Sequence, residues 1–571
     1  MKTSLQIASA ARLDPIGTIA ERAGISERFV EHHGRSKAKI DLNVLAELRD
    51  RPLGKYILVT AITPTPLGEG KTTTTIGLGM AMSKLGKNAA IALRQSSIGP
   101  VFGIKGGGAG GGYAQVVPLE ESVLHLNGDF HALALAHNQI AAMTDNSWYH
   151  GNPLDIDSAR IQIRRVMDVN DRFLRDITIG QGGKANGEPR QTGFEIVAAS
   201  ELMAILALVA GRDSVDALKN LRARLGRMVV AFDRQGTPIT ADDIKAAGAA
   251  TVIMRETLKP NLMQTIENTP AFIHAGPFGN IAHGNSSILA DQIALRVADY
   301  VVTESGFGAD MGAEKFFNIK CRASGLWPAA AVMVATVRAL KSQTGKYKIT
   351  PGKPLPPELL TENPDDVYAG GANLSKQIAN VRRFGVPVVV ALNAFPDDKP
   401  SEIAAVRAIA QAAGAVDMAI STVFADGGQG GLELARMVIA AAEAGHAPPA
   451  FLYALDASIK QKIHAIATEI YGADDVSFSE QAEQQIGTYE AKGFGNLPIC
   501  MAKTHLSLSH DPALKGVPSG YTFPIREVRA SVGAGFIYPL AGTMMTMPGL
   551  GATLSAQSID IDEDGNTIGL F

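Results

Sequence analysis

The sequence predicts an α/β protein built around a doubly wound, mostly parallel β-sheet, and two observations support this prediction. First, apolar runs of strand length alternate with segments of helical composition over much of the chain. This alternation is typical of βαβ units, because parallel strands need a crossover connection between them. Second, a glycine-rich turn stands between an apolar run at 56–62 and a helical segment at 74–85. Turns of this kind occur where a strand of an open α/β sheet ends and a helix N-terminus faces a ligand.

The chain is too long for a single hydrophobic core. It has 571 residues, and chains of this length divide into several domains. We expect one α/β domain at 1–360, with an inserted subdomain at about 115–225, and a C-terminal α/β domain at 361–571. A proline-rich stretch at 350–357 predicts the boundary between them.

The elements follow in order from the N-terminus. Residues 1–50 are predicted to be helical and peripheral, with helices beginning near Asp14 and Asp41. Apolar runs predict strands at 56–62, 88–93, 228–232, 250–254, 271–274, 300–303, 329–337, 387–392 and 417–421. Helical composition and spacing predict helices at 74–85, 192–211, 213–225, 374–384, 401–414 and 432–445. A turn around 563–565 predicts a C-terminal hairpin over 559–570.

Composition argues against several classes of protein. Lys and Arg number 53 against 56 Asp and Glu, so the net charge is −3 and no nucleic-acid-binding surface is suggested. The two cysteines, Cys321 and Cys500, are too few for a disulfide framework or a cysteine zinc site, which favours a reducing, cytoplasmic setting. The N-terminus lacks the layout of a secretory signal, and no uncharged apolar run reaches the roughly 18 residues of a membrane helix. We therefore expect a cytoplasmic protein without nucleic-acid or membrane partners.

The turn at 65–73 carries the strongest chemical signal. It reads Thr65-Pro66-Leu67-Gly68-Glu69-Gly70-Lys71-Thr72-Thr73. Backbone N–H groups and a helix N-terminus can hold phosphates, Lys71 suits the β- and γ-phosphates of ATP, and Thr72 or Thr73 can hold Mg²⁺. The usual pattern opens with glycine where this chain has Thr65, and a carboxylate such as Glu69 is unusual beside phosphates. We nevertheless favour a P-loop NTPase-like, nucleotide-binding domain at 1–360 over a chance glycine turn.

A second group of candidate residues follows the strand at 88–93. Arg94 stands at the strand's end, where an arginine can hold a carboxylate or phosphate by two parallel hydrogen bonds, although a surface salt bridge explains it equally well. The glycine-rich tract at 99–112 includes Lys105, Gly106 and Gly107. Glycine lets backbone approach a ligand closely, so a ligand-contacting loop is favoured over a flexible spacer.

Other candidates are weaker. Phe395 and Phe424 each follow a predicted strand, and each can be a core residue or can stack on a flat ring system. Asp310 and Glu314 are spaced to share a helix face, which suits metal or water positioning or, more commonly, a helix cap. The histidines do not form a metal-binding signature.

Several long motifs together resemble the formate–tetrahydrofolate ligase (10-formyltetrahydrofolate synthetase) family. The likeness runs from about residue 10 to the end of the chain, in family order, and Thr65 is as the family has it. The motifs lie at 63–73, 99–113, 125–131, 276–284, 302–310, 334–341, 497–503 and 545–550.

The resemblance implies that formate, ATP and tetrahydrofolate give 10-formyltetrahydrofolate, ADP and phosphate through formyl phosphate. It further implies that Arg94 holds formyl phosphate beside the glycine tract and that Phe395 and Phe424 sandwich the pterin ring of the folate. Members of the family are homotetramers that monovalent cations such as potassium or ammonium activate, so the same is expected here.

The chain departs from the family pattern mainly in its folate-side half. Phe424 replaces a usual tryptophan, Gln377 a usual histidine, and residues 342–345 a stretch that usually carries His-Gly-Gly. Two alternatives therefore stay open. One is a related ATP-dependent ligase or kinase that acts on a different carboxylate or one-carbon acceptor, and the other is a nucleotide-gated binding protein.

Overall fold

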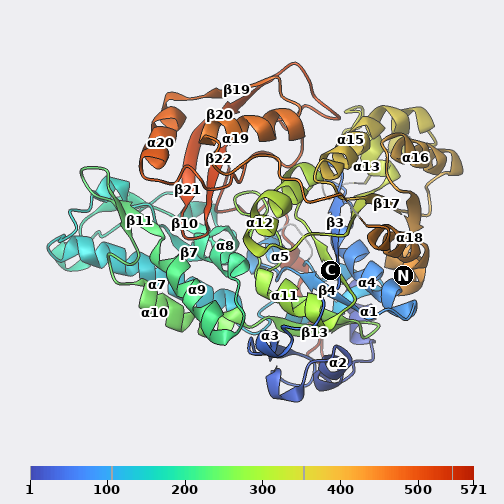
Figure 1. The fold of residues 1–571 in the computed structure, drawn as a ribbon, viewed down its shortest axis with the longest axis horizontal. Coiled ribbons are helices and arrows are strands. Elements are labelled where there is room, and N and C mark those ends of the chain that lie inside the picture. Colours follow the sequence, from blue (N-terminus) through green and yellow to red (C-terminus); the bar gives the residue numbers. More distant parts are fainter. Residues whose placement is uncertain (1, 104–106, 351–353, 446, 543, 571) are drawn as a thin grey trace.

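The centre of the structure is one large β-sheet with helices on both of its faces (Figure 1). The computed structural model describes residues 2–103, 107–350, 354–445, 447–542 and 544–570. Within these ranges twelve strands form the sheet, in the order β1-β2-β13-β14-β4-β15-β3-β16-β17-β18, with β6 paired to β13 and β5 to β6. All neighbours from β14 to β18 pair in parallel, whereas β1, β2 and β13 form an antiparallel edge. The predictions of an α/β fold and of a mostly parallel sheet are confirmed.

Most of the predicted strands belong to this sheet. Its members are β1 Val30–His32, β2 Ala38–Ile40, β3 Lys55–Ala61, β4 Ala89–Leu93, β5 Gly110–Gly111, β6 Ala114–Val117, β13 Asn261–Thr265, β14 Pro270–Ile273, β15 Tyr300–Glu304, β16 Ala330–Ala335, β17 Val388–Asn393 and β18 Met418–Ser421. The predicted strands at 56–62, 88–93, 271–274, 300–303, 329–337, 387–392 and 417–421 are confirmed. They could be recognised because a parallel sheet is buried on both faces, so its strands are continuous apolar runs.

Strand β3 separates two hydrophobic cores. Its side chains alternate, so that Ile57 and Val59 pack into one core and Tyr56 and Leu58 into the other. Helices α4 (Lys71–Lys84) and α18 (Leu432–Glu443) cover the first face, and α11 (Ile288–Val297) and α15 (Pro364–Arg382) contribute to the second. Helices on both faces agree with the predicted doubly wound arrangement.

The remaining helices surround this core. They are α1 Ser4–Ser9, α2 Ile16–Arg22, α3 Val44–Glu47, α5 Ile98–Gly103, α6 Leu119–Val123, α7 Asp129–Tyr149, α8 Glu201–Leu208, α9 Ser214–Gly226, α10 Ala247–Ile253, α12 Arg322–Ser324, α13 Val337–Ser342, α14 Pro357–Leu360, α16 Pro400–Ala412, α17 Val423–Asp426, α19 Ile459–Ala465 and α20 Glu480–Ala491. The predicted helices at 74–85, 213–225, 401–414 and 432–445 are confirmed. Helix α15 begins well before residue 374, because the Asn363 side chain caps Asp366 N–H and Pro364 occupies the first turn.

One predicted strand is wrong. Residues 250–253 lie in helix α10 (Ala247–Ile253) and Met254 caps it, so this segment is not a strand. The helix buries Ala247, Ala250 and Thr251, which is a helical spacing, and leaves Val252 exposed. The apolar run is short enough to form either a helix or a strand, and the alanine-rich residues 247–250 favour the helix.

The part of the chain between the glycine tract and β13 adds small sheets beside the main one. This part consists of helices α7 to α10 and three strand pairs. The pairs are β7 Arg165–Met167 with β10 Phe194–Ile196, β8 Ile177–Ile179 with β9 Arg190–Thr192, and β11 Val229–Phe232 with β12 Pro238–Thr240. The predicted strand at 228–232 is therefore present as β11 but pairs outside the central sheet. The predicted helix at 192–211 is confined to Glu201–Leu208, because β10 and a 3₁₀ turn precede it.

The C-terminal part continues the central sheet before it forms smaller ones. β17 and β18 extend the sheet beyond β16, so the sheet crosses residue 360. Further pairs are β19 Asp475–Phe478 with β20 Thr522–Ile525, β21 Glu527–Ser531 with β22 Phe536–Leu540, and β23 Asp560–Ile561 with β24 Thr567–Ile568, the predicted hairpin. The division into two domains at about residue 360, with an insertion at about 115–225, stays a prediction.

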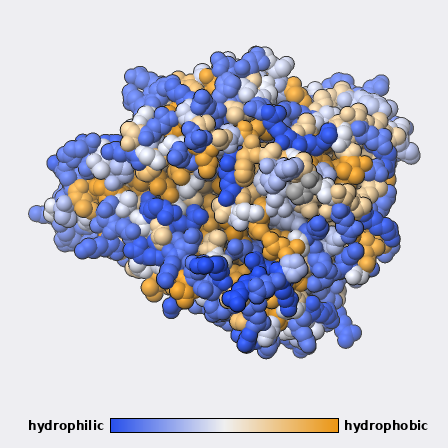
Figure 2. Space-filling model, viewed as in Figure 1, coloured by the Kyte–Doolittle hydropathy of each residue, from blue (hydrophilic) through white to orange (hydrophobic). Residues whose placement is uncertain are grey.

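The surface drawn in Figure 2 mixes hydrophilic and hydrophobic residues over the whole visible face. Throughout the described ranges, each helix is too short or too polar to cross a lipid bilayer.

Candidate active site

The glycine-rich turn connects β3 to α4 in the arrangement that the sequence predicts. Gly68 and Gly70 both have left-handed backbone angles, and Gly70 immediately precedes the first residue of α4, Lys71. The left-handed angle favours glycine at 70, and a Cβ atom there would also lie 2.6 Å from the Asn393 side-chain nitrogen and displace that side chain. The first N–H groups of α4 therefore open toward the edge of the sheet where β3 ends.

Glu69 closes the turn from within. Its side chain is buried, and Oε1 accepts hydrogen bonds from Thr65 N–H at 2.7 Å and from Thr65 Oγ1 at 3.1 Å. Its Oε2 lies 3.8 Å from Lys71 Nζ. The buried Glu69 carboxylate thus receives two hydrogen bonds from Thr65. This gives a structural reason for a threonine at the first position of the turn.

Thr72 and Arg94 meet at a residue that the sequence analysis did not select, Glu304. Thr72 Oγ1 donates to Glu304 Oε2 at 2.7 Å, and Arg94 Nη2 lies 3.5 Å from Glu304 Oε1. Glu304 ends β15, Arg94 follows β4, and β15 lies between β4 and β3. Since parallel strands end at the same edge, the three side chains converge there. The signal available in the sequence was an acid at the end of a predicted strand.

Arg94 is held so that part of its guanidinium stays unpaired. Nη1 donates to the Pro277 carbonyl at 3.3 Å, whereas Nε is buried without a hydrogen-bond partner. The side chain is 26% exposed. The geometry therefore shows the ion pair with Glu304, and the role of Arg94 in anion binding stays a prediction.

The glycine tract packs against Phe424. Residues 99–103 of the tract belong to α5, Lys105 and Gly106 lie outside the described residues, and the described part resumes at Gly107. Beyond it, Tyr113 N–H donates to the Phe424 carbonyl at 2.8 Å, and a Cβ atom at Gly112 would lie 2.1 Å from that oxygen. Glycine is therefore needed at 112 to bring the tract onto the Phe424 backbone.

Phe395 and Phe424 are both partly exposed, at 39% and 53%, rather than core residues. They follow β17 and β18, which are neighbours in the sheet, so both rings belong to the edge where the glycine-rich turn lies. The guanidinium of Arg338 lies 4.0 Å from the centre of the Phe395 ring. Exposed aromatic rings at one sheet edge suit stacking on a planar ligand.

Asp310 and Glu314, weaker candidates from the sequence, are buried. Asp310 pairs with Lys503 at 2.8 Å, and Glu314 accepts a hydrogen bond from Asn318 at 2.8 Å. Across the described ranges, no group of three or more histidine, cysteine or acidic residues has the arrangement of a metal site.

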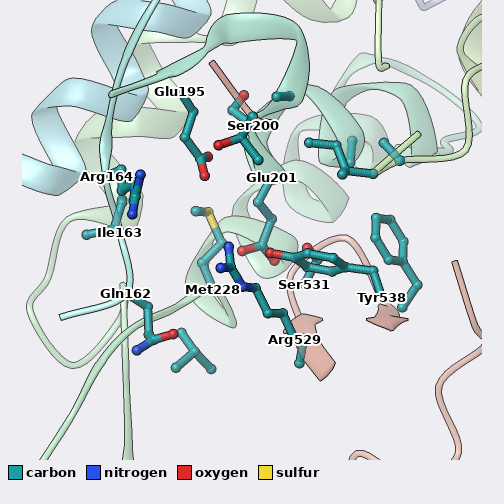
Figure 3. Close-up of a pocket in the computed structure, with 18 of the residues that line it drawn as sticks. Gln162, Ile163, Arg164, Glu195, Ser200, Glu201, Met228, Arg529, Ser531 and Tyr538 are labelled. Atoms are coloured by element: carbon teal, nitrogen blue, oxygen red, sulfur yellow. The ribbon is translucent and has the colours of Figure 1, made fainter. Parts of the chain in front are cut away.

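A separate cavity of about 100 Å³ lies between α8 and the β21–β22 hairpin (Figure 3). Glu195, Glu201, Arg164, Arg529 and Tyr538 line it, and none of the described candidate residues of the sheet edge does. Burial raises the pKa of Glu201 to about 7, while Gly533 and Ala534 N–H groups lower it in part. Burial also raises the pKa of Glu195, against the opposing effect of Arg164 and Arg529.

The raised pKa of Glu201 predicts a pH-dependent stability. Its folded pKa, about 7, exceeds the ordinary 4.5, so its contribution to stability is complete below about pH 4.5 and is lost as pH rises to about 7. The loss amounts to about 3 kcal/mol for this shift. Glu201→Gln should therefore unfold at a higher denaturant midpoint than wild type at pH 8, and this advantage should shrink toward pH 4.5. The exposed Glu188→Gln is the control, and an equal pH trend in both variants contradicts the assignment.

Comparison with known proteins points to one family. The chain matches the family described as "Formate--tetrahydrofolate ligase" over residues 2–571. A protein of that name from Chloroflexus aurantiacus is 69% identical over 572 aligned positions, and the match covers all of both chains. Proteins of the same name from Herpetosiphon aurantiacus and Saccharopolyspora erythraea are 68% and 58% identical. These matches cover all of this chain and 100% and 99% of the relatives.

Proposed function

The chain belongs to the formate–tetrahydrofolate ligase family, and on that basis we propose that it joins formate to tetrahydrofolate with ATP as the phosphoryl donor. The products are 10-formyltetrahydrofolate, ADP and phosphate. The observation that carries the proposal within the chain is the convergence of Lys71, Thr72, Glu304 and Arg94 at one sheet edge. This group supplies what a phosphoryl transfer to a small carboxylate needs, namely a phosphate-binding turn and a free anion-holding donor.

In the first step a formate oxygen attacks the γ-phosphorus of ATP, the bond to the bridging oxygen breaks, and ADP leaves. Formate is a weak nucleophile, so the barrier must fall through positioning and through balance of the phosphate charge. The N–H groups at the start of α4 hold the phosphates, and Lys71 balances charge on the β- and γ-phosphates. This assignment makes residues 65–73 a P-loop NTPase-like turn that opens with Thr65.

Mg²⁺ is the metal that accompanies ATP in such sites, and the residues present fit it. Thr72 Oγ1 and Glu304 Oε2 are oxygen ligands 2.7 Å apart beside the turn. Mg²⁺ binds through one or two protein oxygens together with phosphate oxygens and water. When bound there, the ion neutralises charge that develops on the phosphates. Thr73, the other candidate on the first turn of α4, has no hydrogen bond to an acidic side chain of the described residues.

In the second step the N10 amine of tetrahydrofolate attacks the formyl carbon. Phosphate leaves with the carbon–oxygen bond electrons, and the amine releases its proton to solvent. Arg94 holds the phosphate end of formyl phosphate through the guanidinium edge that Glu304 leaves free. The described part of the glycine tract from Gly107 onward forms the other wall, and Phe395 and Phe424 sandwich the pterin ring. The predicted roles of Lys105 and Gly106 rest on the resemblance alone.

The decisive experiment is an assay of the purified chain with ATP, Mg²⁺, formate and tetrahydrofolate. The proposal requires 10-formyltetrahydrofolate and ADP in equal amounts, and negligible ADP when formate is left out. ADP release that needs formate but yields no folate product would indicate a different one-carbon acceptor. ATP hydrolysis that ignores formate would indicate a nucleotide-gated protein instead. The homotetramer, activation by potassium or ammonium, and a cytoplasmic location stay predictions from the resemblance.

The stacking role of Phe424 leads to a separate prediction. Phe424→Leu should raise KM for tetrahydrofolate about fivefold and leave KM for ATP unchanged, because loss of an aromatic stacking contact costs about 1 kcal/mol. Phe424→Trp should keep or lower KM for tetrahydrofolate, since it enlarges the ring. The matched control is Phe173→Leu, whose ring is 85% exposed and lies away from the sheet edge. An unchanged KM for tetrahydrofolate in Phe424→Leu would remove this residue from the folate site.

A further inference from the structure

Thr63, two residues before the glycine-rich turn, is bonded at every polar group it has. Its N–H donates to Asn373 Oδ1 at 3.1 Å, and its carbonyl accepts from Gln343 Nε2 at 3.1 Å. Its hydroxyl oxygen accepts from Asn373 Nδ2 at 2.8 Å and from Gln377 Nε2 at 3.1 Å. Three amide side chains from two segments, the end of α13 and the middle of α15, thus converge on one residue.

These contacts lie in the interior. Thr63, Asn373 and Gln377 are fully buried, and Gln343 is 4% exposed. A buried amide is costly unless its hydrogen bonds are made, and an apolar side chain would fill the same space without that cost. Asn373 and Gln377 are four residues apart on α15, so both amides come from one helix face. The arrangement therefore indicates that these amides hold Thr63 in one position by hydrogen bonds and do not merely fill space.

The three amide side chains of Gln343, Asn373 and Gln377, here called the amide cluster, also contact the C-terminal part of the chain. Gln377 Nε2 also donates to Asp310 Oδ1 at 2.8 Å, and Asp310 pairs with the fully buried Lys503 at 2.8 Å. Asn373 Nδ2 donates to the Gly516 carbonyl at 2.9 Å, and Gln343 Oε1 accepts from Gly516 N–H at 3.2 Å. The loop between Lys503 and Gly516 and the helix α15 thus form one rigid support behind Thr63.

We propose that Gln343, Asn373 and Gln377 are positioning residues for the phosphate turn. They fix Thr63, Pro64 has a restricted φ angle, and Thr65 then starts the turn through its bonds to Glu69. The position of Lys71 and of the first N–H groups of α4 against ATP follows from that starting point. The proposal rests on the proposed ATP-dependent function of the turn, although its structural part stands without it.

The test compares Gln343→Met and Gln377→Met with wild type and with a matched control, Gln264→Met. Methionine keeps the length of glutamine but cannot donate or accept the same hydrogen bonds. Gln264 is equally buried and bonded, but its partners are Asp14 and Asn268, in another part of the chain. Any general effect of removing a buried amide therefore appears in the control as well.

The first measurement is hydrogen exchange of residues 60–72 in the ligand-free protein. Both test variants should exchange about tenfold faster in this peptide than wild type, whereas Gln264→Met should not. Equal exchange in all four proteins overturns the proposal. Because no nucleotide is present, this result holds even if the wild-type chain turns out not to use ATP, which would refute the proposed function alone.

The second measurement separates positioning from loss of folded protein. With ATP varied, kcat/KM should fall about tenfold to a hundredfold with a raised KM for ATP, and KM for tetrahydrofolate should stay unchanged. A lower kcat with unchanged KM for ATP would instead indicate fewer active molecules and overturn the assignment. If a glutamine variant does not fold, Thr63→Val and Thr63→Ser decide the same question. Serine keeps the hydroxyl acceptor and should resemble wild type, while valine should show the raised KM for ATP.

Discussion

Replacement of Lys71 by alanine is expected to lower kcat/KM for ATP by at least about a thousandfold. Positive groups at a transferring phosphoryl group contribute factors of this size, and Lys71 is the cation on the first turn of α4. The fold should persist, because Glu69 keeps its two hydrogen bonds from Thr65 and the glycine-rich turn stays closed. The measurement is a steady-state assay with ATP varied, together with a thermal unfolding curve.

The control for Lys71 is Lys84→Ala, at the other end of the same helix. Lys84 is 40% exposed and pairs with Glu267 at 3.4 Å, so its loss removes a helix lysine without touching the turn. Lys84→Ala should keep near-normal rates. A Lys71→Ala enzyme with more than about a tenth of wild-type kcat/KM would be incompatible with a phosphate-binding role for this residue.

Replacement of Arg94 by alanine is the second change with a large expected effect. The rate of formate-dependent ADP release should fall about a hundredfold to a thousandfold, the usual loss when a group that stabilises a developing anion is removed. The rate of Arg94→Lys should lie between those of wild type and Arg94→Ala, because lysine keeps the charge but cannot hold a carboxylate or phosphate by two parallel hydrogen bonds. This order of activity, wild type above lysine above alanine, is the expected result.

Arg94 also pairs with Glu304, so the experiment needs a control for the lost ion pair. Arg407→Ala removes a partly exposed arginine that pairs with Asp417 at 3.0 Å, away from the turn. Glu304→Gln keeps an oxygen acceptor for Thr72 but removes the charge that Arg94 faces. If Arg94→Ala and Arg407→Ala lose the same small fraction of activity, Arg94 acts only as a structural ion-pair partner.

Much of the fold could be predicted from sequence because burial on both faces leaves a plain pattern. The runs that became β3, β4, β15, β16, β17 and β18 are mainly apolar and buried. The short hairpin β1–β2 has no such run, and the short apolar run at 250–254 suits a helix as well as a strand. The glycine-rich turn between β3 and α4 was recognisable because its pattern depends on local spacing. Glu304 was not selected, because a single acid at a strand end acquires meaning only when the sheet order places it beside Thr72 and Arg94.

The amide cluster around Thr63 was harder still to foresee. Gln343, Asn373 and Gln377 are 280, 310 and 314 residues away from Thr63 along the chain. Buried amides and exposed amides look alike in a sequence, and the sequence analysis treated Gln377 only as a departure from a family pattern. Long-range polar contacts of this kind follow from topology rather than from local residue type.

Under the proposed function, the contact between Phe424 and residues 112–113 connects the folate side of the site to the glycine tract. The Phe424 carbonyl accepts the hydrogen bond from Tyr113 N–H, so under the proposed function a planar ring on Phe424 would contact the residue that holds the end of the glycine tract. If one ligand favours a particular conformation of this contact, it alters the affinity for the other by some factor. Thermodynamic reciprocity then requires the same factor in the opposite direction. Under the proposed function, a synergy between folate and phosphate binding that is measured in one order of addition therefore fixes the synergy in the other order.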